Sequence, residues 1–216
     1  MLGVKYLCYI FVGSHKWDDH IYEIMYLFFD VETNGLPKRY NAPIDDVDNW
    51  PRVVQIAFSR YSEDGDEVSS YGAIVYPDDF EIPQETVDVH GITKERALNE
   101  GISGNEVFTA FTNEALKSKY LVAHNFDFDY PTVSAEIVRY GLKNEINGKE
   151  SICTMKPRAV KEFCALPGRF GDYKWPKLTE LHEKLFGEPF EDAHDALVDV
   201  NACARCFFEL KKRGIL

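Results

Sequence analysis

Cysteine is scarce in this chain of 216 residues, and its five cysteines stand at the scattered positions 8, 153, 164, 203 and 206. An odd, scattered set argues against a disulfide framework and favours reduced thiols in a cytoplasmic protein. Cys203 and Cys206 form a C-x-x-C pair within an apparent helix, and no second Cys/His pair stands at zinc-finger spacing. We therefore interpret these two thiols as buried structural side chains.

Basic residues are also in short supply, because 24 Lys and Arg face 36 Asp and Glu, for a formal net charge of −12. General binding of nucleic acid depends on many cations that neutralise phosphates, so this balance argues against extended duplex binding. It does not argue against phosphodiester chemistry, since a local basic patch and metal ions can hold a short strand end.

Long hydrophobic runs are missing as well. The apolar segment 6–12 is far shorter than the roughly 20 residues that cross a bilayer, and its flanks do not fit a signal peptide. We expect no membrane association. We also expect residues 1–24 to be a dispensable extension, or Met25 to be the natural start, and residues 25–216 to form one globular domain.

Two carboxylates at the end of an apolar run are the most informative feature that the sequence does contain. Asp30 and Glu32 follow the segment 25–29, and alternation along a strand places them on one face with Val31 on the other. Two like charges on one face are unfavourable unless a cation lies between them. The motif therefore predicts a divalent metal site, with a solvated strand end carrying two surface acids as the alternative.

The remaining pattern predicts an α/β fold. An antiparallel meander is expected first, followed by alternating helices and strands, which implies a mixed central sheet flanked by helices. The expected strands are 25–31, 53–59, 71–76, 120–123 and 151–154, with a hairpin turn at 63–66. The expected helices are 105–117, 131–141, 177–186 and 194–213.

A second acidic motif follows the short strand 120–123. His124 and Asn125 lead to Asp129, and Pro131 fits the first turn of a helix. Asp129 stands where an N-cap belongs, so simple capping is one interpretation of this carboxylate. Asp127 is an alternative acidic candidate in the same segment.

A third motif opens the C-terminal helix. Asp199 lies on a helix face otherwise filled by Ala196, Val200 and Cys203, where a carboxylate is unfavourable unless it is paired or bound to metal. His194 fits the irregular turn that leads into the helix, where its ring can reach the same place. The alternative is a capped helix start with a surface histidine.

Together and in this order, the three motifs resemble the DEDD-type 3′–5′ exonucleases. The histidine marks the subclass called DEDDh, which includes the proofreading epsilon subunit of bacterial DNA polymerase III. The likeness runs from residue 25 to about residue 213 and includes the segments 48–52, 90–93 and 174–178. Its spacing selects Asp129 over Asp127. The resemblance implies a ribonuclease H-like fold and release of nucleoside 5′-monophosphates from single-stranded or frayed DNA 3′ ends.

The resemblance also implies the roles of individual residues. Two divalent cations, Mg²⁺ with Mn²⁺ as a substitute, would be held by four carboxylates and assisted by one histidine that acts as general base. The implied metal ligands are Asp30, Glu32, Asp129 and Asp199, and the catalytic set adds His194. The implied substrate-binding residues are Thr33, Asn34, Gly35, Leu36, His90, His124, Asn125, Lys174 and Trp175.

Lys174 and Trp175 belong to the most basic stretch of the chain. Residues 149–177 hold seven basic and three acidic residues, and Tyr173 lies beside the tryptophan. Cations among aromatic rings are typical of a site for a single strand held by phosphate contacts and base stacking. The alternative is an ordinary solvated face with core aromatics.

Two other functions use the same features. An RNA 3′–5′ exonuclease or oligoribonuclease-like enzyme would use the same site, whereas a catalytically silent nucleic-acid-binding module should lack one of the five catalytic residues. A polymerase-associated proofreading subunit is a variant of the first interpretation. Because we find no tail after the last expected helix to bind a polymerase, we expect an independent enzyme of DNA repair, replication or turnover.

We expect hydrolysis to become faster as the pH rises through the near-neutral range, because His194 must be neutral to accept a proton from the attacking water. The initial rate should be measured across this range at saturating metal, so that metal occupancy stays constant. A flat profile under that control would count against His194 as the base.

Overall fold

The structure is a computed structural model that describes residues 24–191 and 193–216. The expected extension 1–24 therefore lies outside the described residues, apart from Ile24. No helix in the described ranges is long and apolar enough to cross a membrane.

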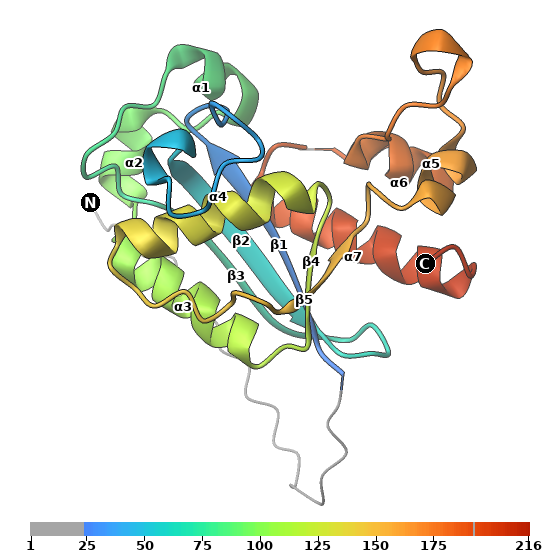
Figure 1. Ribbon diagram of the computed structural model, residues 1–216, viewed down its shortest axis with the longest axis horizontal. Helices are drawn as coiled ribbons and strands as arrows, with labels where there is room; N and C mark the ends of the chain where they lie inside the picture. Colours follow the sequence, from blue (N-terminus) through green and yellow to red (C-terminus); the bar gives the residue numbers. More distant parts are fainter. Residues whose placement is uncertain (1–23, 192) are drawn as a thin grey trace, which may run out of the picture.

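A five-stranded mixed sheet forms the centre of the fold (Figure 1). The strands are β1 Tyr26–Thr33, β2 Val53–Tyr61, β3 Glu67–Ile74, β4 Tyr120–Ala123 and β5 Glu150–Cys153, in the order β3-β2-β1-β4-β5. β1, β2 and β3 form an antiparallel meander, whereas β4 runs parallel to both β1 and β5. The predicted combination of a meander with parallel strands is confirmed.

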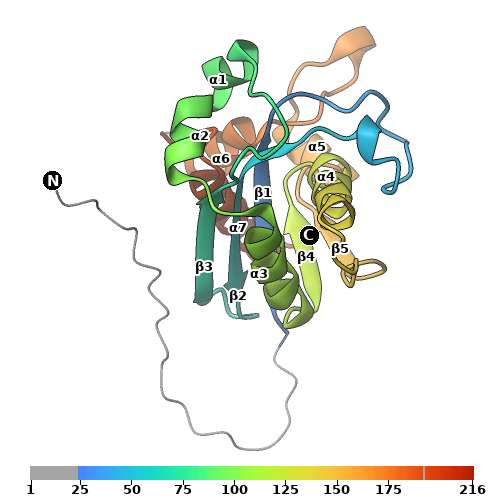
Figure 2. The same cartoon turned by 90° about the vertical axis from the view of Figure 1, so that its left-hand side faces the viewer.

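Helices cover both faces of this sheet (Figure 2). The α-helices are α1 Gln84–His90, α2 Lys94–Glu100, α3 Gly104–Leu116, α4 Phe126–Arg139, α5 Arg158–Cys164, α6 Leu178–Phe186 and α7 Ala196–Lys212. Two 3₁₀ turns, η1 Val47–Asn49 and η2 Arg169–Gly171, lie in the connections. α3 and α4 pack on one face and α7 packs on the other, while α5 and α6 pack against α7.

The alternation of β1 side chains directs its two acids toward the α7 side. Leu27, Phe29 and Val31 belong to the core beneath α3 and α4, whereas Tyr26 and Phe28 pack with α7 residues. Since side chains alternate along a strand, Asp30 and Glu32 continue the α7 face. The prediction that Val31 points the other way is confirmed.

Two helix starts differ from the prediction. α4 begins at Phe126 rather than at 131, so Asp129 lies in its first turn and is not the N-cap. The N-cap is Asn125, which has a φ of 138°. Pro131 is the sixth residue of the helix, where it has no N–H to donate to the Asp127 carbonyl.

α7 begins at Ala196 rather than at 194, so His194 lies in the turn before the helix, as expected for its ring to reach the site. Three short helices were not predicted. α1 and α2 lie in or next to a proline-containing stretch, and α5 lies in the basic segment. Each has seven residues, which is too short for a clear helical period.

The cysteines of the described residues are free. Cys164, Cys203 and Cys206 are buried, and Cys153 is half-buried. Cys203 belongs to the core between β1 and α7, and Cys206 faces α5 and α6. The interpretation of both as structural thiols agrees with this burial.

Candidate active site

Four carboxylates from three elements converge on one cavity of about 400 Å³. β1 contributes Asp30 and Glu32, α4 contributes Asp129, and α7 contributes Asp199; His194 lines the same cavity. They meet because β1 and β4 are adjacent and parallel, so α4 starts at the edge of the sheet where β1 ends. The structure thus brings together all five residues that the sequence motifs selected.

His194 is held over the acids by an irregular turn. Its backbone N–H donates to Asp199 Oδ2 at 2.9 Å, and its φ of 78° lies in the left-handed region. Asp195 caps α7 by accepting the Leu197 N–H at 3.0 Å. One donor atom each of Glu32, His194 and Asp199 lie within 4.8 Å of one another, a spacing that suits a shared cation.

The electrostatics of these acids call for a positive ion. Burial raises the pKa of Asp30 well above its usual range, and repulsion from Asp129 and Asp199 adds to the effect. Burial and the same two neighbours raise the pKa of Glu32 to about 8. Burial likewise raises the pKa of Asp129 to about 7 and raises that of Asp199.

No lysine or arginine of the described residues forms a salt bridge with any of these four acids. Burying several carboxylates without a cation is strongly unfavourable. Their oxygen atoms are the ligands that hard divalent cations prefer. The donor set therefore fits divalent metal ions.

The turn that follows β1 is fixed by its own polar groups. Thr33 Oγ1 donates to the Gly35 carbonyl at 2.8 Å. Asn34 Nδ2 donates to the Glu81 carbonyl at 3.0 Å, and Asn34 Oδ1 accepts the Arg52 N–H at 2.8 Å. The Asn34 side chain is thus committed to the fold, whereas the Leu36 side chain is 73% exposed.

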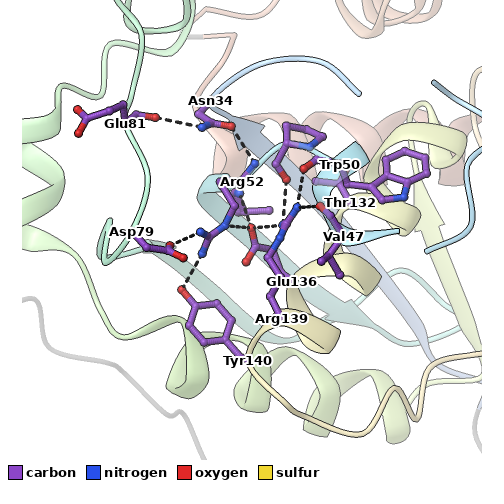
Figure 3. A network of polar contacts seen from close by, with 12 residues as sticks. Asn34, Val47, Trp50, Arg52, Asp79, Glu81, Thr132, Glu136, Arg139 and Tyr140 are labelled. Atoms are coloured by element: carbon purple, nitrogen blue, oxygen red, sulfur yellow. Dashed lines mark hydrogen bonds and ion pairs between the residues drawn. The ribbon is translucent and has the colours of Figure 1, made fainter. Parts of the chain in front are cut away.

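Arg52 also joins a buried ionic triad that the sequence did not reveal (Figure 3). Glu136 on α4 is only 1% exposed and accepts at Oε1 from Arg52 Nε and Arg139 Nη1, both at 2.8 Å. Arg52 further contacts Asp79 and donates to the Tyr140 hydroxyl at 3.3 Å. Arg52 lies directly before β2, and its guanidinium therefore ties the start of that strand to α4 and to the segment before α1.

Arg139 completes this anchoring from the other end of the loop. It donates to the carbonyls of Val47, Trp50 and Pro51. These contacts hold the segment 47–51 against α4, directly before Arg52. The Arg52–Glu136–Arg139 triad thereby fixes the turn at Asn34 relative to the helix that carries Asp129.

His90 reaches the site from the end of α1. It is 8% exposed, and its Nδ1 accepts the Ile92 N–H at 3.1 Å. Its Nε2 has no well-formed partner in the described part of the chain. Burial lowers the pKa of His90, and the backbone of Thr33 and the ring of His194 are near enough to influence it. The structure thus places His90 beside the turn that follows β1.

His124 and Asn125 both line the cavity, in different ways. The His124 Nδ1 lies 2.9 Å from Thr154 Oγ1 and its Nε2 lies 3.1 Å from the Pro176 carbonyl, so both ring nitrogens are engaged. Burial lowers the pKa of His124 to about 4, which keeps the ring neutral. Asn125 lines the cavity and has a positive φ, which is a strained backbone conformation for a residue other than glycine. Strain of this kind is often found at functional sites.

Lys174 and Trp175 lie outside the wall of this cavity. Lys174 Nζ bonds Glu180 at 2.5 Å, and the Trp175 ring, 38% exposed, lies 5.0 Å from the Lys161 ammonium. The exposed Lys177 lines the cavity instead. Lys177 belongs to the basic segment 149–177, but the sequence alone does not show which part of that segment reaches the site.

Removing the carboxylate of the triad should destabilise the protein. We expect Glu136→Leu to cost about 3–5 kcal/mol in the free energy of unfolding, because two buried guanidinium groups lose their counter-charge. The triple change Arg52→Met, Glu136→Leu, Arg139→Leu should recover most of that loss. Urea unfolding measures the free energy of unfolding of the wild type and of both variants. The control is Glu100→Ala, which removes the exposed Arg96–Glu100 pair and should change that free energy little. Wild-type stability in Glu136→Leu would contradict this assignment.

The metal-free protein should lose stability as the pH rises from about 4.5 to 8. In the unfolded protein, carboxyl groups release their protons near pH 4. In the folded protein, Glu32 and Asp129 have raised pKa values and release their protons only at higher pH. The unfolded state then binds fewer protons, so the free energy of unfolding falls across this window.

Asp30→Asn should flatten that slope and stabilise the metal-free protein at pH 8 by at least about 1 kcal/mol. Urea unfolding in chelator at several pH values measures both effects. Asp127→Asn is the matched control, since Asp127 is in the same acidic segment as Asp129 but its side chain is 70% exposed. A wild-type stability that rises through the window would refute the prediction.

Comparison with known proteins agrees with this geometry. The Exonuclease family model matches residues 27–207. An uncharacterized exonuclease of Escherichia phage 186 is 30% identical over 139 residues, which cover 62% of this chain and 69% of that protein. Three-prime repair exonuclease 1 of Homo sapiens is 31% identical over 83 residues, or 38% of this chain and 26% of that protein.

Larger proteins contain a similar domain. The PolC-type DNA polymerase III of Pediococcus pentosaceus is 25% identical over 187 residues, covering 86% of this chain but 11% of that protein. Escherichia coli Exonuclease I in complex with a dA16 oligonucleotide has a TM-score of 0.72 at 19% identity, over 88% of this chain and 41% of that chain. The chain thus spans less than half the length of these two proteins. It belongs to the Exonuclease family and has its ribonuclease H-like fold, as its three acidic motifs predicted.

Proposed function

We propose that this chain is a divalent-metal-dependent 3′–5′ exonuclease that acts on single-stranded or frayed DNA ends and releases nucleoside 5′-monophosphates. The convergence of four carboxylates and one histidine in a single cavity carries the proposal. Membership of the Exonuclease family supports hydrolysis. The complex of Exonuclease I with an oligodeoxynucleotide supports DNA as the substrate.

The carboxylates divide naturally between two cations. Glu32 and Asp199 would hold one ion, Asp129 would hold the other ion or its water, and Asp30 would be a ligand of both. Oxygen ligands favour Mg²⁺, with Mn²⁺ as a substitute. When bound, two such ions stabilise the charge that develops on the attacking and leaving oxygens of a phosphoryl displacement.

His194 takes the proton of the attacking water in this proposal. Its backbone bond to Asp199 and its turn before α7 fix the imidazole beside Glu32 and Asp199. An exposed histidine at the mouth of the cavity can then pass the proton to solvent. Its position outside the helix is what allows its ring to face the cavity that Asp199 lines.

The terminal nucleotide would lie between the turn that follows β1 and the wall formed by Lys177. We expect the exposed Leu36 side chain to contact the sugar and base, and the backbone of Thr33 and Gly35 in the same turn to contact the nucleotide as well. Lys177 offers a cation to the phosphate. The side chains of Asn34 and His124 bond other parts of the chain, so we expect these two predicted substrate-binding residues to act by positioning the walls of the site.

We assign the exonuclease domain to residues 25–216 and treat residues 1–24 as dispensable for it. The free thiols of the described residues support a reducing, cytoplasmic setting. A role in DNA repair or replication follows from the activity proposed.

Degradation of a 5′-labelled single strand tests the proposal. With Mg²⁺ we expect a ladder that shortens from the 3′ end, no cleavage in EDTA, and a rate at least about 100-fold lower in Asp30→Ala, since it removes a ligand of both ions. Asp127→Asn should retain the wild-type rate.

A matched RNA strand belongs in the same experiment. If RNA is cleaved faster than DNA, RNA is the preferred substrate, and the same residues carry out the same chemistry on it. Binding of both strands without cleavage would overturn the enzyme assignment and leave a silent binding module.

A further inference from the structure

A hairpin at residues 166–176, here called the aromatic hairpin, projects from the body between α5 and α6 (Figures 1 and 2). Its two arms are paired: the Lys174 N–H donates to the Leu166 carbonyl at 3.0 Å and the Gly168 N–H donates to the Asp172 carbonyl at 2.8 Å. A Cβ on Gly168 would lie 2.6 Å from that same Asp172 carbonyl oxygen, so the close pairing requires glycine there. The projecting segment is therefore a hydrogen-bonded hairpin with a defined pairing of its two arms.

Phe170 at the tip is fully exposed, at 104%. It adopts φ 59° and ψ 26°, a left-handed conformation that is unfavourable for a residue with a side chain. Its ring stacks on no aromatic ring and no cation in the described ranges. Neither its packing nor its backbone explains this phenylalanine, so a ligand outside the fold is the better explanation.

The returning arm carries two further exposed rings. Tyr173 is 44% exposed and Trp175 is 38% exposed. Their spacing of two residues places them on one side of an extended arm. Three accessible aromatic faces thus follow one another from the tip toward the body.

The charges around these rings are mixed, with an excess of cations: Lys161 pairs with Asp172 of the hairpin at 2.7 Å, and Lys174 pairs with Glu180 at 2.5 Å. Arg169, next to Phe170, forms no salt bridge with a described residue, and the Lys161 ammonium lies 5.0 Å from the centre of the Trp175 ring. In a chain with a net charge of −12, this gathering of cations and rings is local. Successive bases stack on such rings while the cations neutralise phosphates, which is how proteins hold single strands.

The base of the hairpin is continuous with the active-site cavity. The Pro176 carbonyl accepts from His124 Nε2 at 3.1 Å, and the next residue, Lys177, lines the cavity. A strand whose 3′ end occupies the cavity can therefore extend along the returning arm toward the tip.

We propose that the aromatic hairpin is a second binding site for single-stranded DNA, which holds nucleotides upstream of the one being removed. Phe170 at its tip would make the enzyme favour longer strands over very short ones. This proposal rests on the function proposed above.

Phe170→Gly should remove the aromatic ring without destabilising the fold, because glycine adopts a positive φ freely. We therefore expect the Tm of this variant to be no lower than that of the wild-type protein. Steady-state kinetics on a DNA 20-mer and on a trinucleotide provide the readout. We expect KM for the 20-mer to rise about 5- to 10-fold, as for loss of one stacked base, with kcat and the trinucleotide kinetics unchanged. Phe170→Tyr should retain the wild-type KM, since it keeps the aromatic face.

Leu116→Ala is the matched control, since Leu116 is 47% exposed and lies at the end of α3, close to where β1 begins and away from the end of β1 that carries the acids. An unchanged KM for the 20-mer in Phe170→Gly, in a protein that cleaves DNA, would overturn the hairpin proposal alone. If the wild-type protein cleaves neither DNA, anisotropy with the labelled 20-mer still tests the hairpin: equal affinity of wild type and Phe170→Gly would overturn it. Binding of another protein through Phe170, with unchanged DNA affinity, would also overturn it.

Discussion

The repulsion among four converging carboxylates is the constraint on which the rest of this structure depends. Asp30, Glu32, Asp129 and Asp199 face one another in a cavity where water screens them poorly, and no lysine or arginine of the described residues forms a salt bridge with them. In the metal-free protein, this repulsion and burial favour the protonated form of the carboxyl groups. A pair of divalent cations reverses that preference, so the same arrangement that weakens the metal-free fold prepares the site for catalysis.

The fold withstands this repulsion because the elements that carry the acids are anchored by apolar packing. Phe28 and Phe29 on β1 are fully buried on opposite faces of the sheet, and Phe207 of α7 stacks edge-on against Phe28. Asp30 directly follows these two buried residues on β1, so it has little freedom to move away from the other acids. On the other wall, the Arg52–Glu136–Arg139 triad couples α4 to the turn after β1, so the metal ligands and the proposed nucleotide contacts share one framework.

Local patterns were sufficient to predict β1 and the meander, because side-chain alternation is a property of short segments. The five catalytic candidates depended instead on the resemblance of the three motifs, taken together, to the DEDD-type exonucleases. The start of α4 was mispredicted because Pro131 looks like a helix start, whereas Asn125 takes a backbone conformation that the surrounding structure imposes. The Arg52–Glu136 pair joins residues 84 apart in sequence, so no local pattern reveals it. The same holds for Lys177, whose place in the cavity depends on how the aromatic hairpin is attached.

Calorimetric titration of Mn²⁺ into the metal-free protein tests the central claim most directly. We expect binding of about two ions per chain, release of protons from the raised-pKa carboxyl groups, and loss of binding in Asp30→Asn but not in Asp127→Asn. Failure of the wild-type protein to bind Mn²⁺, or equal binding by Asp30→Asn, would show that the four carboxylates do not form a metal site.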